Sequence, residues 1–341
     1  MNQRGADWVG TEPAIELRNV RRVFRRTTGR GLRRSTTETE AVKGITLRVD
    51  RGEIIGWLGP NGAGKSTTIK MCTGILVPTS GETRVLGLDP TRQRRQITRN
   101  IGVVFGQRSQ LWWDLPLLDS FTLLHKIHRI ERHDAQRRID ELSALFDVRS
   151  QLDVPVRQLS LGQRMRGELI AALLHQPQVL FLDEPTIGLD VVSKHAMREA
   201  LLALRNDHGV TIVLTTHDLG DVRRLCDRVV VIDHGQVALD TSLAGLLARA
   251  GSQRTLIATF ESESDAQRVS STALTGLTTS SIESTRVAFD VDLDVRSIPH
   301  ALDALGALAV ICDLTVVERD IEQIVRDLYA AQTQTADSPP A

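Results

Sequence analysis

The sequence has few cysteines, few aromatic residues and no excess of charge of either sign. Its three cysteines, Cys72, Cys226 and Cys312, lie far apart and form no C-x-x-C pair, which excludes a disulfide framework and predicts ordinary thiols in a reducing compartment. The 42 basic residues balance the 42 acidic ones, so no bulk attraction to nucleic acid or anionic lipid is expected. Aromatic residues make up only 4%, which provides few platforms for stacking on single-stranded nucleic acid.

Long apolar runs are also missing. No window approaches the ~18 to 20 uninterrupted apolar residues that a membrane-spanning helix requires. The first residues, MNQRGADWVG, contain no apolar core of a signal peptide. We therefore expect that, if the protein works at a membrane, another chain crosses it.

Length and composition predict a large domain followed by a smaller one. At 341 residues the chain exceeds the usual size of a single core, and its composition shifts toward Ser and Thr from Arg254. We expect an N-terminal tail over 1–13, a core domain over 14–248 with a helical subdomain at about 115–175, a small α+β domain over 249–330 and a disordered tail over 331–341.

Apolar periodicity places the elements of these domains. In the core, strands are expected at 14–23, 41–49, 53–58, 83–86, 101–105, 179–182, 211–215, 229–232 and 236–239. In the small domain, strands are expected at 255–260, 287–291 and 310–317, and helices near 298–305 and 321–328. Two helices, around 121–127 and, behind an Asp134 cap, 139–146, interrupt the α/β alternation.

An arginine-rich stretch separates the first two expected strands. Eight arginines and no acid lie between Arg18 and Arg34, and residues 27–39 contain almost no apolar residue. We expect 27–39 to form a loop, either a solvated one or one that touches phosphate or lipid.

The stretch IIGWLGPNGAGKST, residues 54–67, carries the most specific motif. It matches the spacing G-x-x-x-x-G-K-S directly after an apolar run short enough to be a buried strand. Backbone N–H groups of such a loop cradle a triphosphate, and side chains at its glycines would obstruct them. Lys65 is expected to reach the terminal phosphates, and the Ser66 hydroxyl to hold magnesium. The predicted nucleotide-binding loop comprises Gly59, Pro60, Asn61, Gly62, Ala63, Gly64, Lys65, Ser66 and Thr67.

Further along the chain, acidic residues and a histidine follow apolar runs. The run VLFL ends in Asp183 and Glu184, as expected where a central parallel strand reaches the carboxyl edge of its sheet. Phosphoryl transfer to water requires a metal, a positioned water and charge stabilisation. Asp183 would position magnesium beside Ser66, Glu184 would orient or deprotonate the water, and His217 would contact the terminal phosphate. The predicted catalytic residues are Glu184, His217 and Lys65.

The order of these motifs, together with the segment LSLGQ at 159–163, resembles the nucleotide-binding subunits of ATP-binding cassette (ABC) transporters over about 14–248. LSLGQ lies one helix before the acidic pair, and general phosphate-loop ATPases lack it. The resemblance implies a P-loop NTPase cassette with a RecA-like core, an antiparallel β subdomain and a helical signature subdomain. It also implies binding of ATP and Mg²⁺ and hydrolysis of ATP.

The resemblance assigns further roles by position. Phe24 is similar to the aromatic residue that stacks on the base, and Gln107 to the glutamine that links the metal to transporter contacts. The implied magnesium site consists of Ser66, Gln107 and Asp183. The loop that crosses to the partner consists of Gly188, Leu189 and Asp190. The signature that contacts ATP on the partner consists of Leu159, Ser160, Leu161, Gly162 and Gln163, with Ser160 and Gly162 as donors.

Two positions depart from the family pattern. The signature is usually LSGGQ, and Leu161 replaces its first glycine, so we expect binding to persist with a different local backbone. The family's glutamine usually comes one residue earlier, where this chain has Gly106. Gln107 is therefore expected to take that role, with Gln110 as the alternative.

In the family, the signature of one subunit caps ATP held by the phosphate loop of the other. The resemblance thus implies a pair of cassettes, expected to be a homodimer, that drives a separate integral membrane permease from the cytoplasmic side of the membrane. Trp112 and Trp113 follow the glutamine loop and either dock this permease or pack on the chain's own helices. The single cassette, the compact C-terminal domain and the segments LDEPTIGLD and WWDLP resemble ATPases of type-2 multidrug, daunorubicin-resistance-like exporters.

Three alternatives stay open. Importer ATPases also carry C-terminal domains. A soluble cassette ATPase acting on nucleic acid or the ribosome would use the arginines between Arg18 and Arg34, but the single cassette and neutral charge oppose it, and no direct nucleic-acid partner is expected. A regulatory subunit that binds ATP without hydrolysis is disfavoured by Glu184 and His217. The sequence does not name the transported substrate.

Overall fold

The computed structural model describes residues 12–28, 35–106, 109–216, 218–249 and 253–318. Backbone contacts divide the chain into two compact units, 1–243 and 244–341, so the division lies five residues before the expected end of the core domain at 248. None of the described helices is long and apolar enough to cross a membrane. The expected tail 331–341 and terminal helix 321–328 lie outside the described residues.

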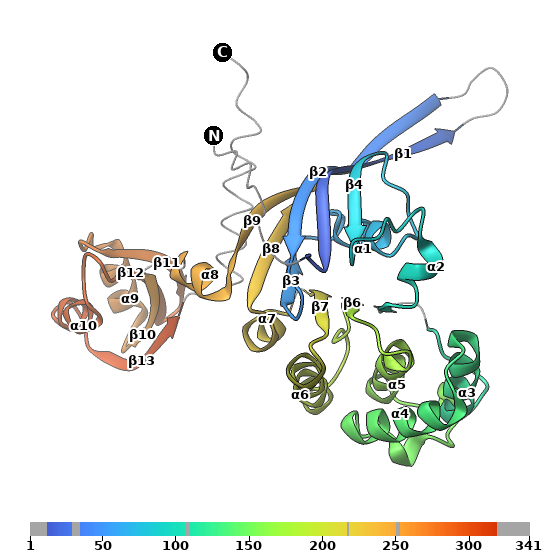
Figure 1. The fold of residues 1–341 in the computed structure, drawn as a ribbon. Coiled ribbons are helices and arrows are strands. Elements are labelled where there is room, and N and C mark those ends of the chain that lie inside the picture. Colours follow the sequence, from blue (N-terminus) through green and yellow to red (C-terminus); the bar gives the residue numbers. More distant parts are fainter. Residues whose placement is uncertain (1–11, 29–34, 107–108, 217, 250–252, 319–341) are drawn as a thin grey trace. The chain divides into compact units, whose positions relative to one another are not determined.

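A six-stranded sheet forms the centre of the first unit (Figure 1). Its order is β5-β6-β7-β3-β8-β9, and all neighbours are parallel except β8 and β9. The inner strands are continuous apolar runs because both faces of the sheet are covered, and Trp57 and Phe181 are fully buried. The strands are β3 (Ile54–Leu58), β5 (Ile101–Phe105), β6 (Val179–Asp183), β7 (Thr211–Thr215), β8 (Arg228–Asp233) and β9 (Gln236–Ser242).

The helices of this unit fall into two groups. Four follow strands of the unit: α1 (Lys65–Cys72), α2 (Arg94–Ile97), α6 (Val191–His208) and α7 (Leu219–Leu225). A helical group, α3 (Leu117–His128), α4 (Arg132–Leu145) and α5 (Leu161–Leu173), packs together through buried residues such as Phe121, Ile139 and Met165. The expected cap at Asp134 is wrong. Glu131 is the N-cap residue, and Asp134 lies in the first turn, where its charge complements the positive helix end and it pairs with Arg137.

An antiparallel sheet of order β2-β1-β4 completes the first unit, with β1 (Ile15–Thr28), β2 (Ser35–Val49) and β4 (Ser80–Val85). The loop expected over 27–39 is wrong in its extent, because β1 continues to Thr28 and β2 starts at Ser35. Cross-strand ion pairs support this ribbon, with Arg25 Nε 2.7 Å from Glu38 and Arg21 Nη1 3.0 Å from Glu40. Residues 29–34 lie outside the described part.

The second unit is a small α+β fold. Its antiparallel sheet has the order β11-β12-β10-β13, and buried residues such as Phe260, Phe289 and Leu305 form its core. Helix α9 and strand β11 were not expected, because their exposed positions are mostly Ser, Thr and Glu. The elements are α8 (Leu243–Arg249), β10 (Gln253–Phe260), α9 (Glu263–Ser271), β11 (Leu277–Glu283), β12 (Arg286–Asp292), α10 (Ile298–Gly306) and β13 (Ile311–Glu318).

Two histidines stack where the helical group meets the central sheet. The rings of His128, in α3, and His175, after α5, have centroids 4.2 Å apart and planes 6° from parallel. His175 Nε2 lies 2.8 Å from the carbonyl oxygen of Ile101, at the start of β5. Burial, and next the neighbouring His128, lower the pKa of His175 to about 4, so this imidazole is neutral in the folded protein near pH 7.

This pair predicts a loss of stability in mild acid. The unfolded chain takes up a proton at His175 below pH 6.5, whereas the folded chain does so only below about pH 4, so the free energy of unfolding falls as pH drops through this window. We expect His175→Gln to reduce the difference in unfolding free energy between pH 7 and pH 4.5 by on the order of 2 kcal/mol, measured by urea denaturation. His133→Gln, at an exposed position of α4, serves as the control. Identical pH dependence of both variants would refute the assignment.

Candidate functional site

The phosphate loop joins β3 to α1 at the carboxyl edge of the central sheet. Residues 61–67 and Glu184 line a pocket of about 120 Å³ there. Lys65 is buried, and its Nζ donates hydrogen bonds to the carbonyl oxygens of Gly59 at 2.6 Å and Pro60 at 3.1 Å. Burial lowers the pKa of Lys65, while the Glu184 and Asp183 carboxylates act to raise it. The arrangement places a positively charged donor beside the start of α1, where phosphate oxygens are also attracted by the helix dipole.

The three glycines of this loop are required for different reasons. A Cβ atom at Gly59 would lie 2.2 Å from the carbonyl oxygen of Ile232, and one at Gly64 would lie 2.7 Å from that of Ala41. A Cβ atom at Gly62 would meet no described atom within 4 Å. Gly62 and Gly64 have φ of +84° and +108°, which disfavour other residues. At Gly59 and Gly64 the backbone of neighbouring strands leaves no room for a side chain. At Gly62 there is room for a side chain, and glycine is favoured only because of the positive φ angle.

Asp183 connects the ends of three elements. Its Oδ1 accepts hydrogen bonds from the hydroxyl of Ser66, in α1, at 3.1 Å and from the hydroxyl of Thr215, at the end of β7, at 2.6 Å. Carboxylate and hydroxyl oxygens are ligands that Mg²⁺ accepts, so the predicted pair of Ser66 and Asp183 fits this ion. Thr215 is not among the site residues predicted from the sequence. Its position at the end of an apolar run, like that of Asp183, could have indicated that it lies at the same edge of the sheet.

Glu184 adopts an unusual backbone conformation. Its φ is +53°, a left-handed value that is uncommon outside glycine, and its N–H donates to the carbonyl oxygen and hydroxyl of Thr215 at 3.0 and 3.1 Å. Glu184 thus turns away from the strand direction and lines the phosphate-loop pocket. Backbone strain of this kind concentrates at functional sites.

The signature begins helix α5 with a complete capping box. The Ser160 hydroxyl accepts a hydrogen bond from the N–H of Gln163, and the Gln163 side chain accepts one from the N–H of Ser160. No acceptor among the described residues takes the proton of the Ser160 hydroxyl, so this hydroxyl can donate to an anion. None of residues 159–163 lines the phosphate-loop pocket described above. Within the described chain, the signature therefore contributes no residue to that pocket.

The crossing loop packs against the signature. A Cβ atom at Gly162 would lie 2.6 Å from the Ser193 hydroxyl, and one at Gly188 would lie 2.9 Å from Leu161 Cδ2. Asp190 caps α6 by accepting from the N–H and hydroxyl of Ser193, both at 2.8 Å, and these bonds lower the pKa of Asp190. The next two residues, Val191 and Val192, are 83% and 78% exposed.

Segment 109–111, after the glutamine position, is anchored to the signature helix. Buried Glu168, in α5, accepts hydrogen bonds from the Ser109 hydroxyl and from the Gln110 N–H, the latter at 2.9 Å. Burial raises the pKa of Glu168, and these bonds oppose the rise. The Gln110 amide donates to the carbonyl oxygen of Val103 at 2.7 Å, which directs it toward β5 and opposes its use as the alternative glutamine. Gln107 lies outside the described residues.

His217 also lies outside the described residues, but its neighbours form a dense polar network. Fully buried Asp221 accepts hydrogen bonds from the hydroxyls of Thr186 and Thr216 and from Arg198 Nε at 2.6 Å. Asp218 pairs with Lys194 at 2.5 Å. The network ties both sides of position 217 to α6 and to the loop after Glu184. Sequence reasoning did not find it, because its members are scattered along the chain.

The aromatic candidates are partly exposed. Phe24 has the Arg22 guanidinium 4.7 Å from its ring centroid and does not line the phosphate-loop pocket, so its stacking role stays a prediction. Trp112 and Trp113 are 38% and 52% exposed, and Arg164 lies 5.5 Å from the Trp113 centroid. Neither tryptophan is buried on the chain's own helices, which favours the docking interpretation.

The glycine geometry predicts a difference between two similar variants. Gly64→Ala adds a methyl group that collides with the β2 backbone, whereas Gly62→Ala incurs only the cost of its backbone angle. We expect Gly64→Ala to unfold at lower urea, with an unfolding free energy roughly 1 to 3 kcal/mol below that of Gly62→Ala, and to lose binding of a fluorescent ATP analogue. Equal stability and equal binding of the two variants would contradict this account of the loop.

Comparison with known proteins agrees with this geometry. The family model for ABC transporters matches residues 42–187. The ATP-binding protein NatA of Bacillus subtilis is 33% identical over 61% of this chain and 84% of its own length. The daunorubicin/doxorubicin resistance ATP-binding protein DrrA of Streptomyces peucetius is 35% identical over 72% of this chain and 74% of its own length. The methionine import ATP-binding protein MetN 2 of Enterococcus faecalis is 32% identical over 65% of this chain and 63% of its own length.

Solved structures show the same fold. A dimeric, post-hydrolysis structure of the ATP-binding cassette MJ0796 bound to ADP and Pi has a TM-score of 0.57 and 26% identity, and the match covers 67% of this chain and 98% of that chain. These similarities confirm the predicted P-loop cassette fold, the ATPase activity and the cofactors ATP and Mg²⁺. The chain therefore belongs to the ABC transporter family, as one of its ATP-binding and ATP-hydrolysing subunits.

Proposed function

We propose that two copies of this chain close around ATP, so that the signature of each completes the phosphate site of the other. The observation that carries this proposal is that no residue of 159–163 lines the pocket formed by 61–67 and Glu184. The capped start of α5 offers N–H groups and the Ser160 hydroxyl to an anion from outside the chain. The exposed valines at the start of α6 supply apolar surface beside the crossing loop.

Within this site each residue has a distinct task. Lys65 and the loop N–H groups bind the phosphates, while Ser66 and Asp183 would hold Mg²⁺, which when bound would neutralise phosphate charge. Glu184, fixed by its bonds to Thr215, orients the attacking water and accepts its proton. His217 contacts the terminal phosphate. Gln107 links the metal site to the residues that contact the transporter.

The proposed membrane-spanning partner is a separate permease. The subunit binds to this permease at the cytoplasmic face of the membrane. Trp112 and Trp113 form the docking surface, and Glu168 connects this surface to the signature helix. We infer export, as the name of the daunorubicin-resistance relative suggests. Import is the second candidate, because a methionine import ATPase is similarly close. Inverted membrane vesicles separate the two, since only an exporter accumulates its substrate inside them when ATP is added outside.

The dimer proposal predicts the behaviour of Glu184→Gln. This variant keeps the size of the side chain but cannot accept the proton of water, so ATP binds and is not cleaved. We expect hydrolysis to fall at least about a hundredfold and a dimer to persist in ATP during gel filtration. Glu199→Gln makes the same chemical change at an exposed position of α6 and should hydrolyse normally. A Glu184→Gln protein that stays monomeric in ATP at high concentration would refute dimer closure.

The docking proposal predicts a selective loss in Trp113→Ala. Removing this exposed ring should weaken co-purification with the candidate permease, a six-span protein to be sought among the neighbouring genes, while ATP hydrolysis by the isolated subunit stays unchanged. Ile127→Ala removes another exposed apolar side chain, in α3, and serves as the control. Equal recovery of the permease with the unmodified protein, Trp113→Ala and Ile127→Ala would exclude the tryptophan surface as its docking site.

A further inference from the structure

The polar network around position 217 attaches two segments of the candidate site to one helix. Lys194 and Arg198 lie four residues apart and so share one face of α6. Lys194 Nζ lies 2.5 Å from the Asp218 carboxylate, and Arg198 Nε donates to Asp221 Oδ1 at 2.6 Å. Because Asp218 directly follows position 217, helix α6 holds the segment around this position.

Asp221 extends the network to the loop after Glu184. Its second oxygen, Oδ2, accepts hydrogen bonds from the hydroxyls of Thr186 at 2.5 Å and Thr216 at 3.2 Å, and all three residues are buried. Thr186 lies two residues after Glu184. A buried carboxylate is costly unless it is paired and hydrogen-bonded, so these groups are expected to keep their contacts when the loop shifts.

Helix α6 begins in the crossing loop. Asp190 of this loop caps the helix through Ser193, and Val191 and Val192, in the first turn, are exposed. In the proposed dimer the second copy covers this first turn. The pairs with Asp218 and Asp221 lie about one and two turns further along the same helix, so α6 connects the partner surface with the network.

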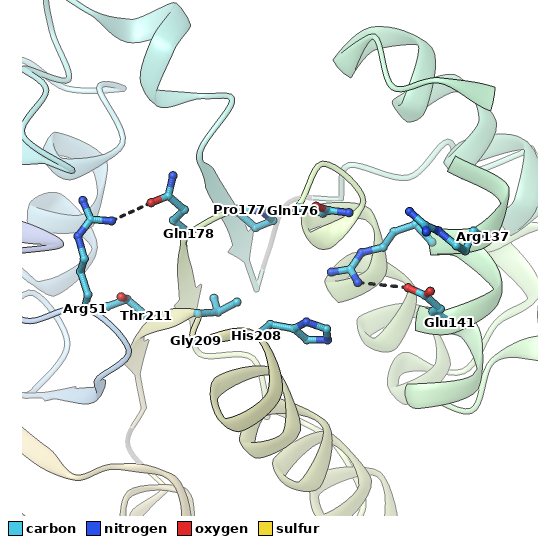
Figure 2. Close-up of a pocket in the computed structure, with 11 residues that line it drawn as sticks. Arg51, Arg137, Glu141, Gln176, Pro177, Gln178, His208, Gly209 and Thr211 are labelled. Carbon is cyan, nitrogen blue, oxygen red and sulfur yellow. Dashed lines mark hydrogen bonds and ion pairs between the residues drawn. The ribbon is translucent and has the colours of Figure 1, made fainter. Parts of the chain in front are cut away.

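The far end of α6 is attached to the central sheet. The helix ends at His208, and Gly209, with a φ of +62°, leads the chain toward Thr211 at the start of β7 (Figure 2). Thr211 donates its N–H to the Gln178 carbonyl oxygen at 3.0 Å, and its hydroxyl accepts from the N–H of Gly52 at 2.9 Å. A pocket of about 550 Å³ opens between this end and α4 (Figure 2). A push on the first turn would therefore tilt α6 about its sheet end.

We propose that Arg198 and Asp221 are positioning residues for ATP hydrolysis. They hold the loop after Glu184 and the segment around position 217 to α6, so that closure of a second copy on the first turn of α6 sets the position of both segments. Neither residue is assigned a contact with ATP, and both act through the segments that they hold. The closure step rests on the dimer of the proposed function.

Two variants separate positioning from stability. Arg198→Met leaves buried Asp221 without its charge partner and is expected to lower the thermal unfolding midpoint, whereas Arg198→Met/Asp221→Asn removes both charges and is expected to restore it. If the ion pair only stabilised the fold, hydrolysis would return with stability. We expect instead that kcat of the double variant stays at least about tenfold below that of the parent, while KM for ATP stays within about twofold.

Arg205→Met is the matched control. Arg205 also belongs to α6, and its Nη1 lies 2.6 Å from Asp227, outside the segments that Asp221 holds. This variant loses an ion pair from the same helix and should keep the kcat of the parent. An equal fall of kcat in Arg205→Met would indicate a general effect on α6 and would overturn the proposal. A parental kcat in Arg198→Met/Asp221→Asn would also overturn it.

Gel filtration in ATP tests the closure step in proteins that also carry Glu184→Gln. We expect the triple variant, Glu184→Gln/Arg198→Met/Asp221→Asn, to form the same ATP-dependent dimer as Glu184→Gln, because the network transmits closure rather than causing it. A dimer with Glu184→Gln alone but not with the triple variant would overturn this inference and leave the proposed function intact. A monomeric Glu184→Gln protein would refute the proposed dimer, and the closure step with it.

Discussion

The carboxylate of Asp183 is the interaction on which the rest of the site depends. One of its oxygens accepts hydrogen bonds from the hydroxyls of Ser66 and Thr215. These bonds fix the start of α1 to the ends of β6 and β7. Only a parallel arrangement brings these ends to one edge, which explains why buried apolar strands precede each polar group. The next residue, Glu184, is bonded to the same threonine and takes a left-handed backbone conformation. A displaced Asp183 would therefore misplace the proposed metal ligands and the proposed base together.

In the proposed dimer, the starts of two helices bind phosphate from two directions. Helix α1 follows a loop without side-chain caps, whereas α5 begins with a self-contained capping box. The first needs its N–H groups for phosphate inside the chain, and the second keeps its start intact while exposed. Leu161, which replaces a glycine of the usual signature, lies against Gly188 of the crossing loop. This departure from the family pattern therefore affects contacts within the chain and leaves Ser160 and Gly162 in place.

Much of the fold could be predicted from the sequence because buried parallel strands are continuous apolar runs. The limits of β5 and β7 agree with the expected ones, and those of β3 and β6 differ by one residue. The β1–β2 ribbon could not be delimited, because its register depends on cross-strand pairs such as Arg25 with Glu38. In the site, the motif predicted the roles of Lys65 and Ser66, and the apolar run before Asp183 predicted the role of that residue. The anchor at Glu168 and the backbone angle of Glu184 arise only in three dimensions.

Helix α5 connects the two tasks that a transport ATPase must link. Its first turn carries the signature, and about two turns later Glu168 holds Ser109 and Gln110. Trp112 lies two residues after Gln110, and its backbone N–H donates to the Ser120 hydroxyl of α3 at 3.1 Å. A helix moves as a rigid rod on this scale, so in the proposed dimer a shift of Ser160 on capping a phosphate would displace the anchored segment as well. Because Glu168 is buried and its carboxylate has two donors from that segment, the segment cannot separate from α5 without leaving an unsatisfied buried acid. In the proposed complex, the link between nucleotide and permease would thus rest on one carboxylate that lies in neither contact surface.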